Sequence, residues 1–265
     1  MDNSLHLSPS YIASLDPYIP SSAAQKLCPR TAPHVTLTYA ASLDSRIALA
    51  PGLQTVLSGP ETKAMTHYLR ARHDAILVGA TTALIDNPRL NSRWEGAGGG
   101  LVSQPRPIIL DPSGRWLGKW DGQENLSRLV REGKGLAPLA VVDEAIALDL
   151  ERLARFTEQG GQLLSLSGYK ESSGGVDWMT ILSKLNELGI KSIMVEGGAT
   201  VINDILKQKN RHLLTSVIVT IAPIFMGAGG VTVSPTTQNE CEPVCRLENV
   251  TWIPMGKDAV MAALI

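Results

Sequence analysis

The sequence predicts an α/β fold whose mixed, mostly parallel sheet ends in an antiparallel hairpin at the C-terminus. Short apolar, β-branched runs alternate with helical patterns along most of the chain, beginning with residues 35–40, 61–72 and 75–80. The last two apolar runs, CRLENVTWIP and AVMAALI, are separated only by MGKD, which leaves no room for a helix. Strands joined so closely run antiparallel.

The strands are predicted from apolar runs of four to ten residues bounded by polar or glycine residues. Before the hairpin they are expected at residues 35–40, 75–80, 106–111, 139–143, 162–167, 192–195 and 213–222. Residues 95–100 and 112–137 are Gly-rich or polar and are interpreted as insertions, because neither flank carries enough strands for a separate domain.

Helix boundaries are indicated by residues that satisfy the free groups at helix ends. Ser58 and Glu61 have the spacing of a capping box, with a proline in the first turn of the helix that follows. A second helix ends near Gly160. A third runs from Asp177 as N-cap to Gly189.

The composition is that of a globular protein: 265 residues, 44% hydrophobic and 18% charged, with a net charge of −1. No cluster of Lys and Arg suggests nucleic acid, and no apolar run is long enough for a membrane span. Three cysteines fit the reducing cytoplasm, and the spacing of Cys241 and Cys245 is too weak a signal for us to predict a metal. Residues 1–33 are Ser/Pro-rich and are expected to form a loosely ordered extension before a single domain at 34–265.

The most informative segment is SIMVEGGATVINDIL at residues 192–206, where an apolar strand meets a glycine pair and then a helix. Gly197 and Gly198 permit a tight turn and a close approach of a ligand, and the helix start presents unpaired N–H groups. The pattern favours a phosphate-binding turn, with an ordinary strand-to-helix turn as the alternative. Glu196 ends a buried strand, a position where a carboxylate more often marks a site than a core.

A second strand-glycine-helix turn lies at residues 75–86, with Gly79 followed by Thr82 and Asp86. If its strand is parallel to residues 192–195, both turns open at the same edge of the sheet, where α/β folds bind ligands. Arg70, Arg89 and Arg93 are near this edge and suggest a bound phosphate; solvated surface is the alternative reading of each.

A third segment, residues 34–48, carries a strand that ends in small residues. Ala40, Ala41 and Ser42 leave room for a flat ring or for close packing against a helix. Asp44 is either a functional carboxylate or a turn residue.

Together these segments resemble the riboflavin-biosynthesis reductase family, which includes fungal and archaeal pyrimidine reductases and the reductase domain of the bacterial deaminase-reductase. AASLDSRIA, LRARHDAILVGATTALIDNPRLNSR, RPIILD and VEGGAT occur in the order of that family's motifs. The resemblance implies a dihydrofolate-reductase-like three-layer fold, a homodimer, and NADPH (or NADH) as hydride donor to a ribosylaminopyrimidine phosphate.

The resemblance also implies roles for individual residues. Gln54 and Val56 replace a serine and a tryptophan of the bacterial relatives. Asp44 and Glu196 are candidate proton carriers. The cofactor-contacting positions are Ala40, Thr82, Asp86, Gly197, Gly198, Ala199, Thr200, Val201 and Ile202, and the substrate-contacting positions are Arg70, Leu90, Arg93, Glu196 and Gln54. For the 2′-phosphate of the cofactor the candidates are Ser167, Lys170 and Ser172.

Neither the H-x-E nor the P-C-x-x-C motif of a zinc deaminase occurs. In the family's fungal branch reduction precedes deamination, so the resemblance implies the 2,5-diaminopyrimidinone as substrate, with hydride delivered to C1′ of the opened ribosyl imine. The alternatives are the deaminated uracil substrate, a dihydrofolate-reductase-like enzyme of other substrate, and a nucleotide-binding protein without catalysis.

Overall fold

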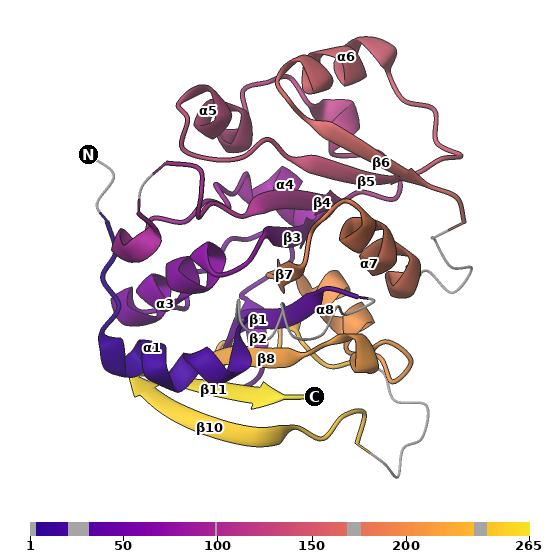
Figure 1. The fold of residues 1–265 in the computed structure, drawn as a ribbon. Coiled ribbons are helices and arrows are strands. Elements are labelled where there is room, and N and C mark those ends of the chain that lie inside the picture. Colours follow the sequence, from indigo (N-terminus) through magenta and orange to yellow (C-terminus); the bar gives the residue numbers. More distant parts are fainter. Residues whose placement is uncertain (1–3, 21–31, 99, 169–175, 236–242) are drawn as a thin grey trace.

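One large sheet forms the centre of the computed structural model, which describes residues 4–20, 32–98, 100–168, 176–235 and 243–265 (Figure 1). Its nine strands have the order β10-β11-β8-β1-β7-β3-β4-β5-β6. They are β1 (His34–Ser42), β3 (Ala75–Gly79), β4 (Arg106–Leu110), β5 (Leu139–Asp143), β6 (Gln162–Leu166), β7 (Ser192–Val195), β8 (Ser216–Ala222), β10 (Glu248–Met255) and β11 (Asp258–Leu264). β2 (Arg46–Ala48) and β9 (Val231–Thr232) pair separately.

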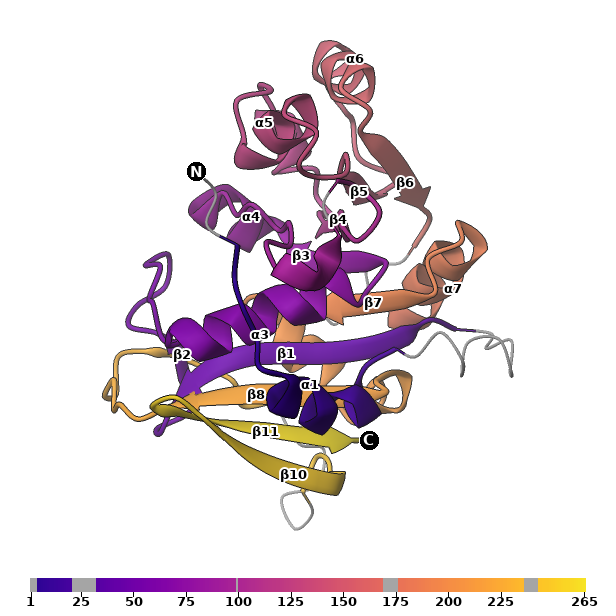
Figure 2. The same cartoon turned by 60° about the vertical axis from the view of Figure 1, so that its left-hand side comes forward.

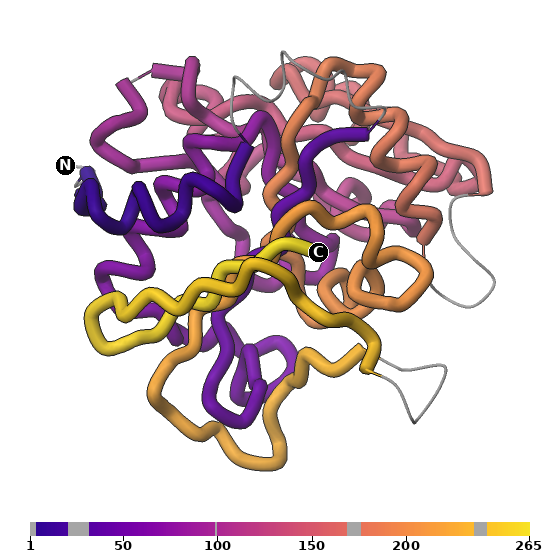
Figure 3. The backbone as a smooth tube through the Cα atoms, turned by 60° about the horizontal axis from the view of Figure 1, so that its bottom comes forward, coloured from indigo at the N-terminus to yellow at the C-terminus, as the bar shows by residue number. Residues whose placement is uncertain are grey.

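The strand directions confirm the predicted mixed sheet. β1 pairs in parallel with both β7 and β8, and β3 pairs in parallel with β7 and β4. β11 is antiparallel to β8 and to β10, so the C-terminal hairpin forms one edge of the sheet. Figure 3 shows the two hairpin strands, in yellow, running side by side. All seven strands expected before the hairpin are present, within a few residues of the predicted bounds.

Helices cover both faces of this sheet, which gives three layers (Figure 1). α7 (Trp178–Glu187) and α8 (Ala199–Ile205) pack on one face. The other face carries α1 (Pro9–Leu15), α3 (Pro60–Ala71), α4 (Ala80–Asp86), α5 (Asn125–Arg131) and α6 (Leu150–Glu158). Ala75 and Leu77 of β3 point to the core on the face of α7 and α8, whereas Ile76 and Val78 point to the core on the opposite face. Burial on both faces explains why the strands are continuous apolar runs.

The predicted capping box of α3 is wrong, although the helix begins where expected. Its N-cap is Gly59, which has no side chain to cap with. The carboxylate of Asp258, at the start of β11, accepts hydrogen bonds from Gly59 N (2.8 Å) and Thr62 Oγ1 (2.6 Å) instead. A residue nearly 200 positions away in sequence therefore supplies this cap. The N-cap role of Asp177 is confirmed, since its side chain accepts from Thr180 N at 3.1 Å.

Regular structure is present in two segments that the sequence suggested to be a polar insertion (residues 112–137) and a loosely ordered extension (residues 1–33). Residues 112–137 include a 3₁₀ turn (Leu117–Lys119) and α5, and Trp116 and Trp120 pack there against Phe156. Residues 4–20 include α1 and pack on the sheet (Figure 2). Leu7 and Leu15, exposed by 3% and 0%, enter the core there. Both segments have few apolar residues, so their helices are stable only because these residues pack on the sheet and its neighbouring helices.

The same N-terminal segment contacts the loop that contains Arg93. Leu5 N donates to Arg93 O at 2.8 Å, and Glu95 N donates to Leu5 O at 3.1 Å. The ring of Trp94 meets that of Tyr68 edge-on, with centroids 5.0 Å apart. Residues 4–20 therefore fix the backbone on both sides of a predicted substrate residue. No helix in the described parts of the chain has the length and apolar character needed to cross a membrane.

Candidate active site

A large cleft opens at the carboxyl ends of β1, β7 and β3. Its volume is about 1110 Å³, and Ala40, Gly79 and Gly198 line it from the ends of these three strands. Parallel strands place their carboxyl ends at one edge of a sheet, which is where α/β folds bind ligands. The predicted juxtaposition of the two glycine turns is thereby confirmed.

The two glycine turns touch each other in the cleft. A Cβ atom on Gly198 would lie 2.6 Å from Thr82 Oγ1, and one on Gly197 would lie 2.8 Å from Val201 Cβ. Neither position has room for a side chain, which is the physical reason for the glycine pair. The Gly197–Gly198 peptide bond is cis. The described cleft surface continues through Ala199, Thr200, Val201 and Ile202.

Arg70 and Glu196 form a bidentate ion pair at the wall of the cleft. Arg70 Nε donates to Glu196 Oε1 at 2.8 Å and Nη2 donates to Oε2 at 2.7 Å. Arg70 Nη1 also donates to Asn91 O at 3.2 Å. The two side chains are 14% and 18% exposed, so the pair is largely shielded from water. Glu196 neutralises the charge of Arg70 and holds its guanidinium in a fixed orientation.

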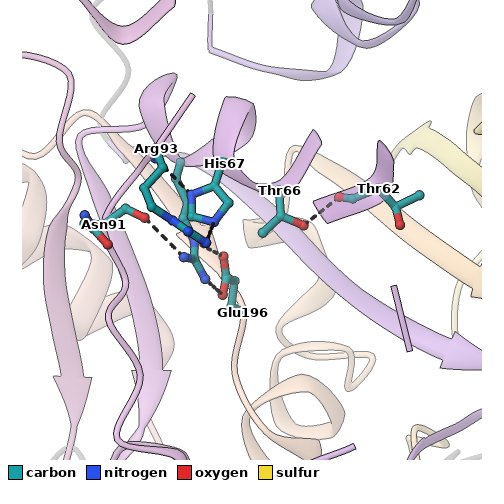
Figure 4. A network of polar contacts seen from close by, with 7 residues as sticks. Thr62, Thr66, His67, Asn91, Arg93 and Glu196 are labelled. Atoms are coloured by element: carbon teal, nitrogen blue, oxygen red, sulfur yellow. Dashed lines mark hydrogen bonds and ion pairs between the residues drawn. The ribbon is translucent and has the colours of Figure 1, made fainter. Parts of the chain in front are cut away.

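His67 and Arg93 lie next to this pair (Figure 4). The backbone N–H of Arg93 donates to His67 Nδ1 at 3.0 Å, and Arg93 Nη2 lies 3.2 Å from His67 Nε2. Burial, reinforced by the positive charges of Arg70, Arg93 and Lys63, lowers the pKa of His67 to about 3. The imidazole is therefore neutral at physiological pH.

Most of the predicted site residues line the cleft. Besides Gly198 to Ile202 and the ion pair, these are Ala40, Gln54, Val56, Thr82, Asp86 and Arg93. Gly197 is buried beside Val201 and is not part of the cleft surface. Burial raises the pKa of Asp86, which keeps this carboxyl closer to its neutral form than an exposed one.

Leu90 does not line the cleft. Its side chain is 1% exposed and packs in the core with α4 and the tryptophans of residues 112–137. Its φ of +54° is uncommon for a residue with a branched side chain. The leucine side chain is therefore a core anchor of this loop rather than a surface that a ligand touches.

The structure does not bring Asp44 to the cleft either. Its carboxylate accepts hydrogen bonds from Ser42 Oγ (2.5 Å), Met226 N (3.1 Å) and Gly227 N (2.7 Å). These bonds, led by that of Ser42, lower the pKa of Asp44 to about 2. The Asp44 carboxylate thus joins the end of β1 to the backbone at Met226 and Gly227, as a turn residue would, and it lies outside the cleft.

Three further cleft residues, Lys63, Thr66 and His67, belong to α3 and were not predicted from the sequence. They share one helical face with Arg70, at spacings of seven, four and three residues, and this periodicity was available as a signal. Arg115 at the rim was also missed; its Nη2 donates to Thr81 Oγ1 at 3.2 Å. Ser167 is exposed and outside the cleft, while Lys170, Ser172 and Cys241 lie outside the described residues.

The fold and its cleft place the protein among reductases with a dihydrofolate-reductase-like fold. Rib7, the riboflavin biosynthesis reductase of Saccharomyces cerevisiae, has a solved structure that matches with a TM-score of 0.75 and 33% identity, over 96% of this chain and 99% of that one. RibD of Acinetobacter baumannii has a TM-score of 0.68 over 88% of this chain and 58% of its own, and at 21% identity the likeness extends to the fold alone.

The chain belongs to the family of the RibD C-terminal domain, whose model matches residues 33–261. A Debaryomyces hansenii protein named 2,5-diamino-6-ribosylamino-4(3H)-pyrimidinone 5′-phosphate reductase is 43% identical, over 98% of both chains. The Saccharomyces cerevisiae protein of the same name is 37% identical, over 87% of this chain and 86% of its own. The family predicted from the sequence motifs is therefore confirmed.

Proposed function

We propose that this protein reduces the ribosylamino group of 2,5-diamino-6-ribosylamino-4(3H)-pyrimidinone 5′-phosphate to the ribitylamino group, with NADPH as the hydride donor. The names of its relatives support this substrate. The observation that carries the proposal is the composition of one cleft, where a glycine turn faces the arginine and glutamate side chains of Arg70, Arg93 and Glu196.

The cleft has room for two ligands at once. Its volume of about 1110 Å³ exceeds the range of roughly 300–1,000 Å³ that is usual for one small molecule. Gly198, Ala199, Thr200, Val201 and Ile202 line the cleft, and Gly198 has no side chain that could block a ligand. These residues fit a dinucleotide, for which Ala40 would form a wall and Thr82 and Asp86 would offer polar contacts.

In this proposal the cofactor supplies a hydride, and the protein supplies alignment. The substrate's ribosylamine opens to an imine at C1′, which is already electrophilic and requires little acid catalysis. Holding the hydride donor close to C1′ and aligned with it can lower the activation free energy of hydride transfer by about 7–11 kcal/mol. Arg70 fixes the carboxylate of Glu196, whose remaining lone pairs are acceptors for N–H or O–H groups of the pyrimidine substrate.

The direct test is oxidation of NADPH, followed at fixed enzyme concentration, with three substrates in parallel: the diamino compound, its deaminated uracil analogue and dihydrofolate. We expect the diamino compound to have the highest kcat/KM. A higher kcat/KM for the uracil analogue would show that the protein acts after deamination and not before it. Turnover of dihydrofolate alone, or of none of the three, would refute the proposal.

A pair of variants tests the role of Glu196. If Glu196 orients the substrate or carries a proton, Glu196→Gln lowers kcat/KM for the diamino compound. Unchanged turnover in Glu196→Gln, together with loss of turnover in Arg93→Ala, would show that the glutamate has no part in the reaction.

The preference for NADPH over NADH is proposed to depend on Arg115. This exposed guanidinium lines the cleft beside Thr81, and its Nη2 donates to Thr81 Oγ1 at 3.2 Å. We expect Arg115→Ala to raise the Kd of NADPH about 10-fold, as for loss of a charge-assisted hydrogen bond, and to leave the Kd of NADH unchanged. Equal changes for the two cofactors, measured by fluorescence titration, would exclude this role.

We further propose that residues 34–265 form a single reductase domain, on which residues 4–20 pack, and that the protein is a homodimer in the cytoplasm. β8 itself is almost fully buried between β1 and β11, so it offers no surface for a dimer. The residues after it, Ile224 and Phe225, are 42% and 77% exposed, and Trp252 of the hairpin is 60% exposed. These side chains are the apolar surface that supports a dimer, which sedimentation of the wild type and of Phe225→Asp would test.

A further inference from the structure

The helix α3 contributes four side chains to the cleft from one of its faces. These are Lys63, Thr66, His67 and Arg70. The opposite face, which includes Met65 and Leu69, packs in an apolar core with residues of β7, β8 and β11. Apolar contacts are non-directional, so they hold α3 on the sheet but do less to fix its position along its own axis. The places of the four cleft side chains therefore depend on polar contacts at the two ends of the helix.

The first turn of α3 is held by Asp258, a buried residue at the start of β11. Its Oδ2 accepts hydrogen bonds from Gly59 N at 2.8 Å and from Thr62 Oγ1 at 2.6 Å. The backbone carbonyl of Thr62 in turn accepts from Thr66 Oγ1 at 3.1 Å, a contact that Figure 4 shows. Because Thr66 lines the cleft, two successive hydrogen bonds lead from the C-terminal hairpin to the cleft surface.

The last turn of α3 is held by His73, which is also buried. Its Nδ1 lies 2.7 Å from the carbonyl oxygen of Leu69, and a carbonyl only accepts, so Nδ1 carries the proton. Burial lowers the pKa of His73 to about 3, so the ring is neutral at physiological pH and Nε2 is an acceptor. The hydroxyl of Thr36 in β1 donates to Nε2 at 2.8 Å and accepts from Ser216 Oγ of β8 at 3.0 Å. The end of α3 that carries Arg70 is thus tied to two strands.

Both contacts come from outside the cleft, since neither Asp258 nor His73 lines it. The strands that provide them, β11, β8 and β1, are consecutive in the sheet. One rigid part of the sheet therefore determines where both ends of α3 lie. A displacement of about 1 Å in a group that binds the substrate can lower the rate of an enzyme about 100-fold, so such contacts have consequences for activity.

We propose that Asp258 and His73 are positioning residues of this reductase: they fix α3 at its two ends and thereby set the places of its four cleft side chains relative to the substrate. This inference rests on the proposed function, in which the cleft face of α3 contacts the pyrimidine substrate. In that function the cofactor contacts the glycine turn and α8, so the affinity for NADPH does not depend on Asp258 or His73.

Two matched pairs of variants test these contacts. Asp258→Ala removes the cap of α3, whereas Asp258→Asn keeps an oxygen that can accept. Thr36→Val removes the hydroxyl that holds His73 at a similar side-chain volume, whereas Thr36→Ser keeps the hydroxyl. Asp149→Ala is the control for stability, because Asp149 caps α6 with its side chain and no residue of α6 lines the cleft.

For each variant we measure KM and kcat with the diamino substrate, the Kd of NADPH by fluorescence, and thermal unfolding. A fourth readout needs no substrate: the exchange rate with water of the Arg70 Nε–H, which donates to Glu196, followed by NMR.

We expect Asp258→Ala and Thr36→Val to raise KM about 3- to 10-fold, the range of one weakened hydrogen bond, and to accelerate exchange of the Arg70 proton. Both kcat and the Kd of NADPH should change less than about 2-fold. Asp258→Asn and Thr36→Ser should recover most of the loss. Asp149→Ala should unfold at a lower temperature than the wild type with an unchanged KM.

Several outcomes would overturn the inference. An unchanged KM in Asp258→Ala and Thr36→Val would limit both contacts to a role in stability, and the Thr36 pair decides alone if Asp258→Ala does not fold. Equal losses of substrate and NADPH binding would indicate a general loosening of the cleft. A raised KM in Asp149→Ala would show that KM follows stability. Faster exchange of the Arg70 proton in both variants of a protein that turns over none of the three substrates would retain the positioning of α3 and refute the proposed function.

Discussion

The Arg70–Glu196 ion pair is expected to stabilise the fold as well as the cleft. Exposed pairs contribute about 0–1 kcal/mol, whereas removal of one partner from a fully buried pair costs about 3–5 kcal/mol. With side chains 14% and 18% exposed, and with two bonds of 2.7 and 2.8 Å, this pair is between those limits. We therefore expect Arg70→Met, which leaves Glu196 without its partner, to lower the free energy of unfolding by about 2–3 kcal/mol.

A double-mutant cycle isolates the interaction itself. The free energy of unfolding is measured by urea titration for the wild type, Arg70→Met, Glu196→Gln and the double variant, at one pH and one protein concentration. The double variant should be more stable than the sum of the two single losses predicts, by about 1–2 kcal/mol. The exposed pair Lys184–Glu187, with side chains 48% and 57% exposed, is the matched control and should give a coupling below about 0.5 kcal/mol. Equal couplings for the two pairs would refute the reasoning.

Three further predictions concern the cleft and its supports. The pKa of His67 is about 3 in the folded chain against 6.5 unfolded, so the unfolded chain binds one more proton between these values and stability falls as pH falls from 6.5 toward 3. In His67→Asn the slope of unfolding free energy against pH, measured between pH 4 and 6, should be smaller by about 1.4 kcal/mol per unit; equal slopes would contradict this. Leu5→Pro removes the N–H that holds the Arg93 carbonyl and should raise KM about 3- to 10-fold at constant kcat, with an unchanged KM as the opposing result. Gly198→Ala should cost about 1–3 kcal/mol of stability because its Cβ would lie 2.6 Å from Thr82 Oγ1, and Thr82→Ala should relieve part of that cost; no relief in the double variant would show another cause.

The sheet was predictable because its strands carry a local signal. β5 (Leu139–Asp143) has the bounds that its apolar run predicts, and both of its faces are buried. The hairpin of β10 and β11 was predictable because four residues between two apolar runs leave no other connection. Hydrophobic periodicity and connection length depend only on neighbours in sequence, so they can be recognised without knowledge of the fold.

The supports of the cleft were not predictable in this way. Asp258 caps α3 from the far end of the chain, and the segment of residues 4–20 is ordered by the sheet it covers. Neither carries a local pattern of its own, since a cap supplied from another element leaves no spacing to recognise. The helix α5 was missed for a related reason: its few apolar residues gain their stability from the aromatic cluster around Trp120.

At the site, the sequence by itself determined the residues, and the tertiary structure decided their partners. The glycine pair, Arg93 and Glu196 were identified by type and position, because the chemistry of a phosphate turn restricts which residues can form it. That Glu196 neutralises Arg70, 126 residues away, depends on which strands are neighbours in the sheet. The same holds for His67, whose neutral ring follows from burial and from the positive charges of Arg70 and Arg93. Charge pairing and proton position are set by distances across the fold, and those distances exist only after the chain has folded.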